Sequence, residues 1–159
     1  MANIDTYLKA VGLGVIAGSR SMSAPALLTH HLAKSEPRAL ASTPLGVFSS
    51  SWVATLLRLA AAGEMVADKI PGIPARIEIQ PLAGRVVFGA LSGLLICVAA
   101  NKPAAVGALL GGLGALAGAF GFYHLRRLIG EETAIPDPLL GAAEDAIVIG
   151  GGLALLDNR

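Results

Sequence analysis

Seven ionisable side chains lie inside strongly apolar stretches of this sequence. A charge at the centre of a membrane helix costs about 2.5–3.5 kcal/mol on insertion scales, so several together need partners that offset this cost. We expect these side chains to face one another inside a helix bundle, as ion pairs or as the lining of a polar site. The seven residues are Arg20, Arg58, Glu64, Asp68, Arg85, Glu144 and Asp145.

The positions of these charges separate two roles. Asp68, Lys69 and Arg85 lie near the expected ends of their helices, so each can extend its charge to the membrane surface, and we favour this structural role. Arg58 lies near the middle of its segment, about 120° around the helix from Glu64, so the two cannot pair. Arg58 therefore needs water or an acid from another helix.

The stretch "GSRSMSAPALL", residues 18–28, places Arg20 in a segment that favours a break in the helix. Gly18 and its neighbouring serine can end one half-helix, Ser21 or Ser23 can cap the next, and Pro25 suits its first turn. The sequence therefore predicts a discontinuous first helix around residues 18–25. The alternative is an unbroken helix bent at the proline, with Arg20 paired to Glu64 or Glu144.

A helix that begins at membrane depth presents free N–H groups and a partial positive charge. Arg20 adds a full positive charge beside them, so this point is receptive to an anion, as in discontinuous transporter helices. We expect a carboxylate from another helix, Glu64 or Glu144, to occupy it in the absence of a ligand.

Other chemistries have little support in the sequence. A carboxylate metal site on helices uses Glu-x-x-His pairs, which are absent, and no nucleophile elbow or Ser-His-Asp order occurs. The formal net charge of +1 gives no basic patch for nucleic acid. We therefore expect no enzyme, no metal, no cofactor and no nucleic-acid partner.

Composition and hydropathy indicate an all-α integral membrane protein with a single domain over residues 1–159. Hydrophobic residues make up 54% of the chain and charged residues 14%, against about 25% charged in soluble domains. A bilayer needs about 20 apolar residues per helix. The expected bundle has five such helices, and the alternative has four, with 7–33 as a re-entrant or interfacial piece. The five segments are 7–33, 45–70, 81–100, 104–128 and 138–156.

Lysines and arginines in the short connections predict the orientation. With five spans, Lys69, Arg76, Arg85, Arg126 and Arg127 share one side with the N-terminus, and fewer lysines and arginines lie on the other. This bias predicts a cytoplasmic N-terminus and an external C-terminus.

Glycines at helical spacing predict close helix packing in the fourth segment. Small residues let membrane helices approach closely, which strengthens dispersion contacts and Cα–H···O bonds. The sequence leaves open whether these glycines pack within one chain or between copies, so it admits a homo-oligomer. They are Gly107, Gly111, Gly114 and Gly118.

Several motifs together resemble a bacterial family catalogued as domain of unknown function 4126. They are "GSRSMSAPALL", "GEMVADKIPGIPAR", "AGRVVFGALSG", "YHLRR" and "AEDAIVI". The resemblance implies a small multi-pass protein of the bacterial inner membrane and leaves its activity open. Its signature residues match Arg20, Glu64, Asp68, Lys69, Pro71, Arg76, Arg85, Glu144 and Asp145.

Two functions follow as hypotheses. In the first, the protein is a small transporter or channel in which Arg20 and Arg58 bind a small anion or a lipid headgroup. Glu64, Glu144 and Asp145 would then respond to protons or cations, which gives a route to proton coupling. In the second, it is a non-transporting scaffold or accessory subunit whose charges only fix helix register. A pathway predicts a cavity that reaches an arginine, and a scaffold predicts closed pairs.

Overall fold

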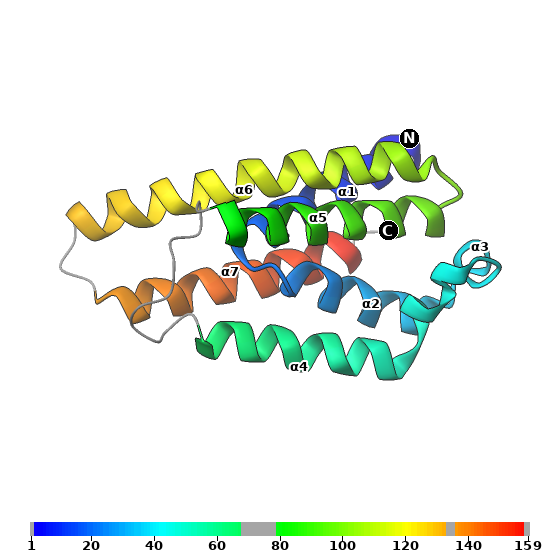
Figure 1. The fold of residues 1–159 in the computed structure, drawn as a ribbon, viewed down its shortest axis with the longest axis horizontal. Helices are drawn as coiled ribbons and strands as arrows, with labels where there is room; N and C mark the ends of the chain where they lie inside the picture. Colours follow the sequence, from blue (N-terminus) through cyan, green and yellow to red (C-terminus); the bar gives the residue numbers. More distant parts are fainter. Residues whose placement is uncertain (1, 68–78, 133–135, 158–159) are drawn as a thin grey trace.

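The fold consists of helices that lie roughly parallel or antiparallel to one long axis (Figure 1). The computed structural model describes residues 2–67, 79–132 and 136–157. These described residues contain helices and no strand. In chain order the elements are α1 (Ala2–Ser19), α2 (Ser23–Ser35), α3 (Arg38–Ala41), the 3-10 helix η1 (Pro44–Ser49), α4 (Ser51–Ala67), α5 (Ile79–Ala99), α6 (Ala104–Glu132) and α7 (Asp137–Asp157).

Three helices in the described part of the chain are long and apolar enough to cross a bilayer. They cover Ile79–Ala99, Ala104–Gly130 and Pro138–Asp157, and they indicate a membrane protein. The number is smaller than the five expected, because α4 is only 17 residues long and the first segment is divided into two shorter helices. The all-helical, apolar character of the chain agrees with the sequence.

The chain reverses direction at the break between α1 and α2. Gly152 of α7 lies against both Ile16 and Leu27, and Lys9 Nζ donates to the Leu156 carbonyl, so α1 runs antiparallel to α7. Figure 1 shows α2 returning toward the end from which α1 came. The two helices form a hairpin, as in the re-entrant alternative, and not one interrupted helix that continues across the bundle.

The hairpin places the start of α1 and the end of α7 at the same end of the molecule (Figure 1). This differs from the expected arrangement, in which the termini lie on opposite sides of the membrane.

Local chemistry explains the reversal. The Arg20 N–H still donates to the Ile16 carbonyl, which closes the last turn of α1, and a turn at residues 21 and 22 follows. Pro25 lies in the first turn of α2, where its missing N–H has no intrahelical partner to lose. The interruption thus falls within the predicted stretch, around residues 18–25.

Helices α1, α5 and α6 form the most tightly packed part of the bundle, through glycines. A methyl group at Gly107 or Gly111 would fall on backbone oxygens of α5, at Gly93 and Gly89 respectively. Such contacts let backbones approach to dispersion distance, the main attraction between helices in lipid. The first two of the predicted packing glycines therefore face α5, within one chain.

The other two predicted packing glycines face a different helix. A methyl group at Gly114 or Gly118 would fall on backbone oxygens of Val11 and Val15 in α1. Gly121, three residues after Gly118, has no atom within 4 Å of an added methyl group. Helix α6 therefore has two glycine faces, one for α5 and one for α1.

Gly118→Ala is expected to lower the free energy of unfolding by about 1–3 kcal/mol, because the new methyl group overlaps the α1 backbone at Val15. Gly121→Ala in the same helix is the matched control and should be neutral or slightly stabilising, since alanine favours a helix. Reversible unfolding in detergent micelles measures both variants. Equal losses in the two variants would contradict the close α1–α6 contact.

Helix α4 lies at the edge of the bundle, where it packs mainly on α2 and η1. Its buried residues are Ala54 and Ala61, whereas Trp52 and Leu59 are exposed. The position of α4 relative to the other helices therefore depends on its contacts with α2.

Candidate functional site

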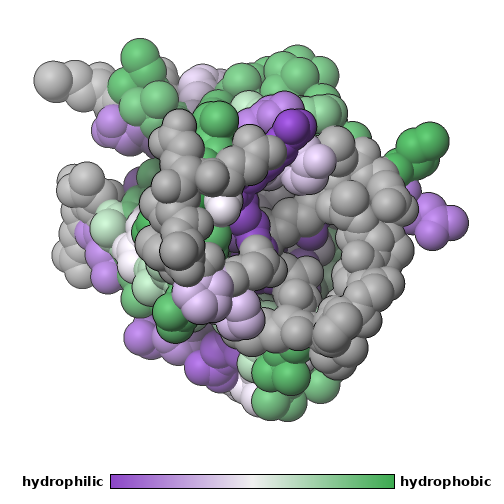
Figure 2. Space-filling view, turned by 90° about the vertical axis from the view of Figure 1, so that its left-hand side faces the viewer, coloured by the Kyte–Doolittle hydropathy of each residue, from purple (hydrophilic) through white to green (hydrophobic). Residues whose placement is uncertain are grey.

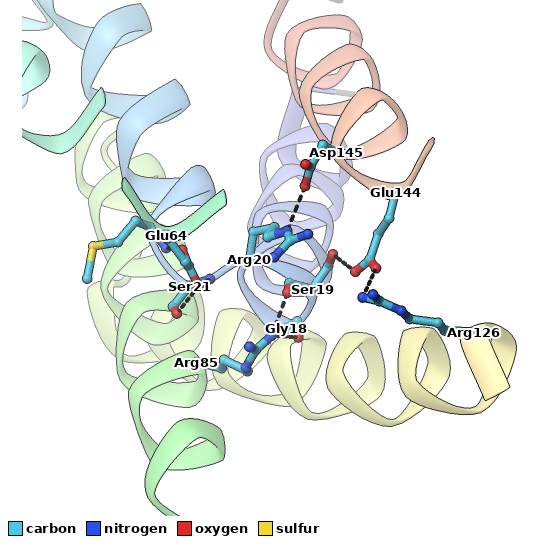
Figure 3. Close-up of polar contacts among 10 residues, drawn as sticks. Gly18, Ser19, Arg20, Ser21, Glu64, Arg85, Arg126, Glu144 and Asp145 are labelled. Atoms are coloured by element: carbon cyan, nitrogen blue, oxygen red, sulfur yellow. Dashed lines mark hydrogen bonds and ion pairs between the residues drawn. The ribbon is translucent and has the colours of Figure 1, made fainter. Parts of the chain in front are cut away.

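The break between α1 and α2 is the centre of a buried charged layer (Figure 3). Arg20, at the break, is 1% exposed, and its Nε lies 2.8 Å from Asp145 Oδ1 of α7. Burial of a charge is unfavourable without a partner. This ion pair therefore joins the break to α7. Its acid is Asp145, and not Glu64 or Glu144, the two acids that the sequence suggested for Arg20.

A second link to α7 runs through Glu144. Ser19 Oγ donates a hydrogen bond of 2.5 Å to Glu144 Oε1, and Arg126 Nη1 of α6 lies 3.6 Å from Oε2. The sequence did not single out Ser19 or Arg126 for the site. The sequence predicts that the helix ends at residue 128, close to Arg126. Helix α6 instead continues to Glu132, so this arginine lies inside the helix, and it faces α7.

Arg85 of α5 stabilises the other side of the break. Its Nη1 donates to the carbonyl of Gly18 at 2.7 Å and to the carbonyl of Ser19. Arg85 is 5% exposed, so the expectation that it reaches the membrane surface is wrong. A cation at a helix C-terminus satisfies carbonyls that have no partner in the helix and interacts favourably with the helix dipole.

The start of α2 holds a carboxylate, as the sequence predicts. Glu64 of α4 accepts hydrogen bonds from the Ser21 N–H at 2.8 Å, the Ser21 hydroxyl at 2.6 Å and the Met22 N–H at 2.8 Å. Both backbone donors belong to the turn that opens α2, where N–H groups lack partners in the helix. Of the two acids considered for this position, Glu64 occupies it.

The layer balances its charges around the break. Its cations are Arg20, Arg85 and Arg126, and its anions are Glu64, Glu144 and Asp145. Five of these six side chains come from helices other than α1 and α2. Four of them contact residues between Gly18 and Met22, and the fifth, Arg126, contacts Glu144. Backbone N–H and C=O groups at the break thus form hydrogen bonds with the buried charged side chains.

Figure 2 shows the molecule from the end at which α4 finishes and α5 begins. Hydrophilic residues lie in the hollow between the helices, and hydrophobic residues cover the outer sides of several helices. This distribution suits a bundle that faces lipid and keeps polar groups inside. Asp68, predicted as a site residue, lies outside the described residues.

Arg58 is not part of the charged layer. Its Nε donates to the Ala54 carbonyl at 3.2 Å and its Nη2 to Thr55 Oγ1 at 3.0 Å, both on its own helix. Among the described residues it forms no ion pair with an acid. Arg58 instead lines a cavity.

This cavity has a volume of about 280 Å³ and lies between α2 and α4, with one residue from α7. Three of its lining residues are polar, namely Ser23, His30 and Arg58. Ser23 is 2% exposed, and its hydroxyl has no hydrogen-bond partner in the described part of the chain. Ser21 and Ser23, both predicted site residues, therefore differ in role: one binds Glu64 and the other faces the cavity.

No cluster of metal ligands occurs in the residues that the structure describes. None of the groups of His, Cys, Asp or Glu there has three members placed to hold an ion. The chemistry that the described site offers is therefore ionic and hydrogen-bonding, through arginines, carboxylates, hydroxyls and backbone N–H groups.

Comparison with known proteins assigns the chain to a family. Neither the curated proteins nor the solved structures give a match. A family model does match, over residues 8–158, and this range includes every residue of the charged layer and of the cavity. The chain therefore belongs to the family described as Domain of unknown function (DUF4126).

Proposed function

We propose that the protein is a small membrane transporter or channel for an anionic solute or headgroup. The observation that carries the proposal is the cavity between α2 and α4, which reaches Arg58 and adjoins the start of α2. A route for an anion needs a cation that a solute can approach, and Arg58 is exposed and has no acid partner among the described residues. Arg20, in contrast, is closed in its ion pair.

Glu64 gives this site a mechanism. The carboxylate holds the N–H groups of Ser21 and Met22, where a bound anion would also be favoured. Met65, the next residue of α4, lines the cavity. An anion that moves along the cavity toward the start of α2 therefore competes with Glu64 for the same donors.

Competition between an anion and Glu64 for the N–H groups at the start of α2 weakens the attachment of α4 to α2. The hydrogen bonds to Glu64 are a main polar attachment of α4 to α2, and α4 packs on little else in the described part of the bundle. Displacement or protonation of the carboxylate removes these charge-assisted hydrogen bonds, which are about twice as strong as neutral ones. The proposed cycle thus couples anion arrival, and proton arrival as a second trigger, to movement of α4.

A scaffold is the second candidate, and the closed charged layer favours it. Arg20, Arg85 and Glu144 are all buried, and each has a partner from another helix. A protein whose charges serve only to fix helix register needs such pairs and no accessible cation. The scaffold therefore accounts for the layer at the break but not for Arg58.

Flux in proteoliposomes separates the two candidates. Arg58→Gln should lower the flux of benzenesulfonate, a membrane-impermeant anion, by about tenfold or more, since a hydrogen bond to a charged group contributes about 1.5–3 kcal/mol. Arg38→Gln, at an exposed arginine of α3, is the control and should transport at the unmodified rate. Equal flux in both variants would remove Arg58 from the mechanism. A wild-type protein without flux supports the scaffold.

A further inference from the structure

The cavity between α2 and α4 has polar groups at its two ends and apolar side chains between them. The two helices are antiparallel, because Glu64 meets Met22 at the start of α2, and Arg58 and His30 line the cavity further along both helices. Seven residues separate Ser23 from His30, which corresponds to about 10 Å along the helix axis. The cavity is therefore elongated along α2.

One end of the cavity attracts negative charge. Arg58 uses Nε and Nη2 on its own helix, and its Nη1 has no partner in the described residues. His30 lines the same end. The lining has a single permanent cation, so one negative charge is enough to balance it.

The other end of the cavity has an unused hydrogen-bonding group. Ser23 Oγ is buried and has no hydrogen-bond partner in the described part of the chain. A buried hydroxyl without a partner is unfavourable, and native proteins rarely keep one. A ligand with a polar group at this position would supply the missing hydrogen bond.

The middle of the cavity selects against bare ions and against large lipids. Its lining there is aliphatic, so an inorganic anion would lose its hydration without replacement along most of the surface. Pockets for drug-sized ligands have volumes of about 300–1,000 Å³, and about 280 Å³ is at the small end of that range. The aliphatic lining residues are Ala26, Leu27, Ala61, Ala62 and Ile149.

We propose that this cavity binds a small amphiphilic monoanion. The anionic head lies at Arg58 and His30, an apolar body of about six to eight carbon atoms fills the middle, and a second polar group hydrogen-bonds Ser23 at the far end. This assignment rests on the proposed function, because it names the substrate class of the same site. Binding tests it without any measurement of transport.

The experiment is equilibrium binding to the full-length protein in phosphatidylcholine nanodiscs, with empty discs as the blank. The probes are 8-hydroxyoctanoate, octanoate and nitrate. We expect 8-hydroxyoctanoate to bind most tightly, octanoate about five- to tenfold more weakly for want of the Ser23 hydrogen bond, and nitrate not at all. Arg58→Gln should weaken both carboxylates by about tenfold or more, and Arg58→Lys should restore part of this loss.

Ser23 has a matched control on the same helix. Ser23→Ala should abolish the preference for 8-hydroxyoctanoate over octanoate and leave octanoate binding unchanged. Ser35→Ala, at an exposed serine whose hydroxyl bonds the His31 carbonyl, should keep the full preference. Loss of the preference in Ser23→Ala alone, with the thermal stability retained, supports the assignment.

Three results would overturn it: equal binding by wild type and Arg58→Gln, a preference that survives Ser23→Ala, or tight binding of nitrate. Displacement of 8-hydroxyoctanoate by phosphatidylglycerol in the discs would also overturn it, in favour of a lipid headgroup. Binding without flux contradicts transport and leaves the site intact. Benzenesulfonate flux without binding of either octanoate contradicts the hydroxy-acid geometry and leaves transport intact.

Discussion

Arg20→Gln is expected to lower the free energy of unfolding by about 3–5 kcal/mol, the cost of removing one partner of a buried ion pair. The arginine is 1% exposed and lies 2.8 Å from Asp145, so its loss leaves a carboxylate in the bundle without its counter-charge. Reversible unfolding in mixed detergent micelles measures the loss.

The double variant Arg20→Gln/Asp145→Asn tests whether the pair causes this effect. Removal of both charges should cost less than the sum of the two single losses, because the double variant leaves no buried charge of the pair without its partner. Arg38→Gln, at an exposed arginine, should change stability by less than about 0.5 kcal/mol. Strict additivity of the two single losses would show that the pair does not act as a unit.

Glu64→Ala is expected to destabilise the α2–α4 contact by about 3 kcal/mol, because three hydrogen bonds to a carboxylate are lost at once. The effect should be local, since α4 packs mainly on α2 and η1. Hydrogen exchange at the amides of Ser21 and Met22 should accelerate by about a hundredfold, while the amides of α5 and α6 keep their protection.

Two further variants calibrate this result. Ser21→Ala removes only the hydroxyl donor and should cost about 1 kcal/mol. Asp5→Asn removes an exposed carboxylate in the first turn of α1 and should cost a few tenths of a kcal/mol through the helix dipole. If exchange at the start of α2 stays slow in Glu64→Ala, the carboxylate does not hold the two helices together.

The sequence predicts those parts of the site that follow from local chemistry. The residues Gly18, Ser19 and Pro25 favour an interruption wherever they occur in an apolar helix, and the chain breaks there. The cost of a charge in lipid requires Arg20 to have a partner, and it has one. Which acid pairs with which group depends on how the helices are rotated about their axes, and composition does not contain that information.

The errors also have physical causes. Arg85 is close enough to the start of α5 to reach the surface, yet its side chain turns to the carbonyl groups that end α1. For Arg58 the sequence left open an acid from another helix or water, and it did not foresee that the carbonyl and hydroxyl groups of its own α4 would take two of its nitrogens. In each case the arginine binds a nearby backbone oxygen. For Arg85 this oxygen takes the place of solvent, and for Arg58 it takes the place of a carboxylate or water.

The direction of the chain after the break could not be read from hydropathy. An interrupted helix that crosses the bundle and a hairpin that returns have the same composition and the same residues at the turn. The difference arises from tertiary contacts, since Ile16 and Leu27 both pack on Gly152 of α7. Those contacts join positions more than a hundred residues apart, beyond the range of any local pattern.

The glycine contact between α1 and α6 has a consequence for biosynthesis. Helix α1 has its closest backbone partner in α6, which is made about a hundred residues later. Until α6 enters the bilayer, Gly14 and Gly18 face lipid or another chain, and among the earlier described helices α1 packs mainly on α2 and α5. A nascent chain stalled before Ala104 should therefore expose α1 to membrane proteases, and extension through Glu132 should protect it.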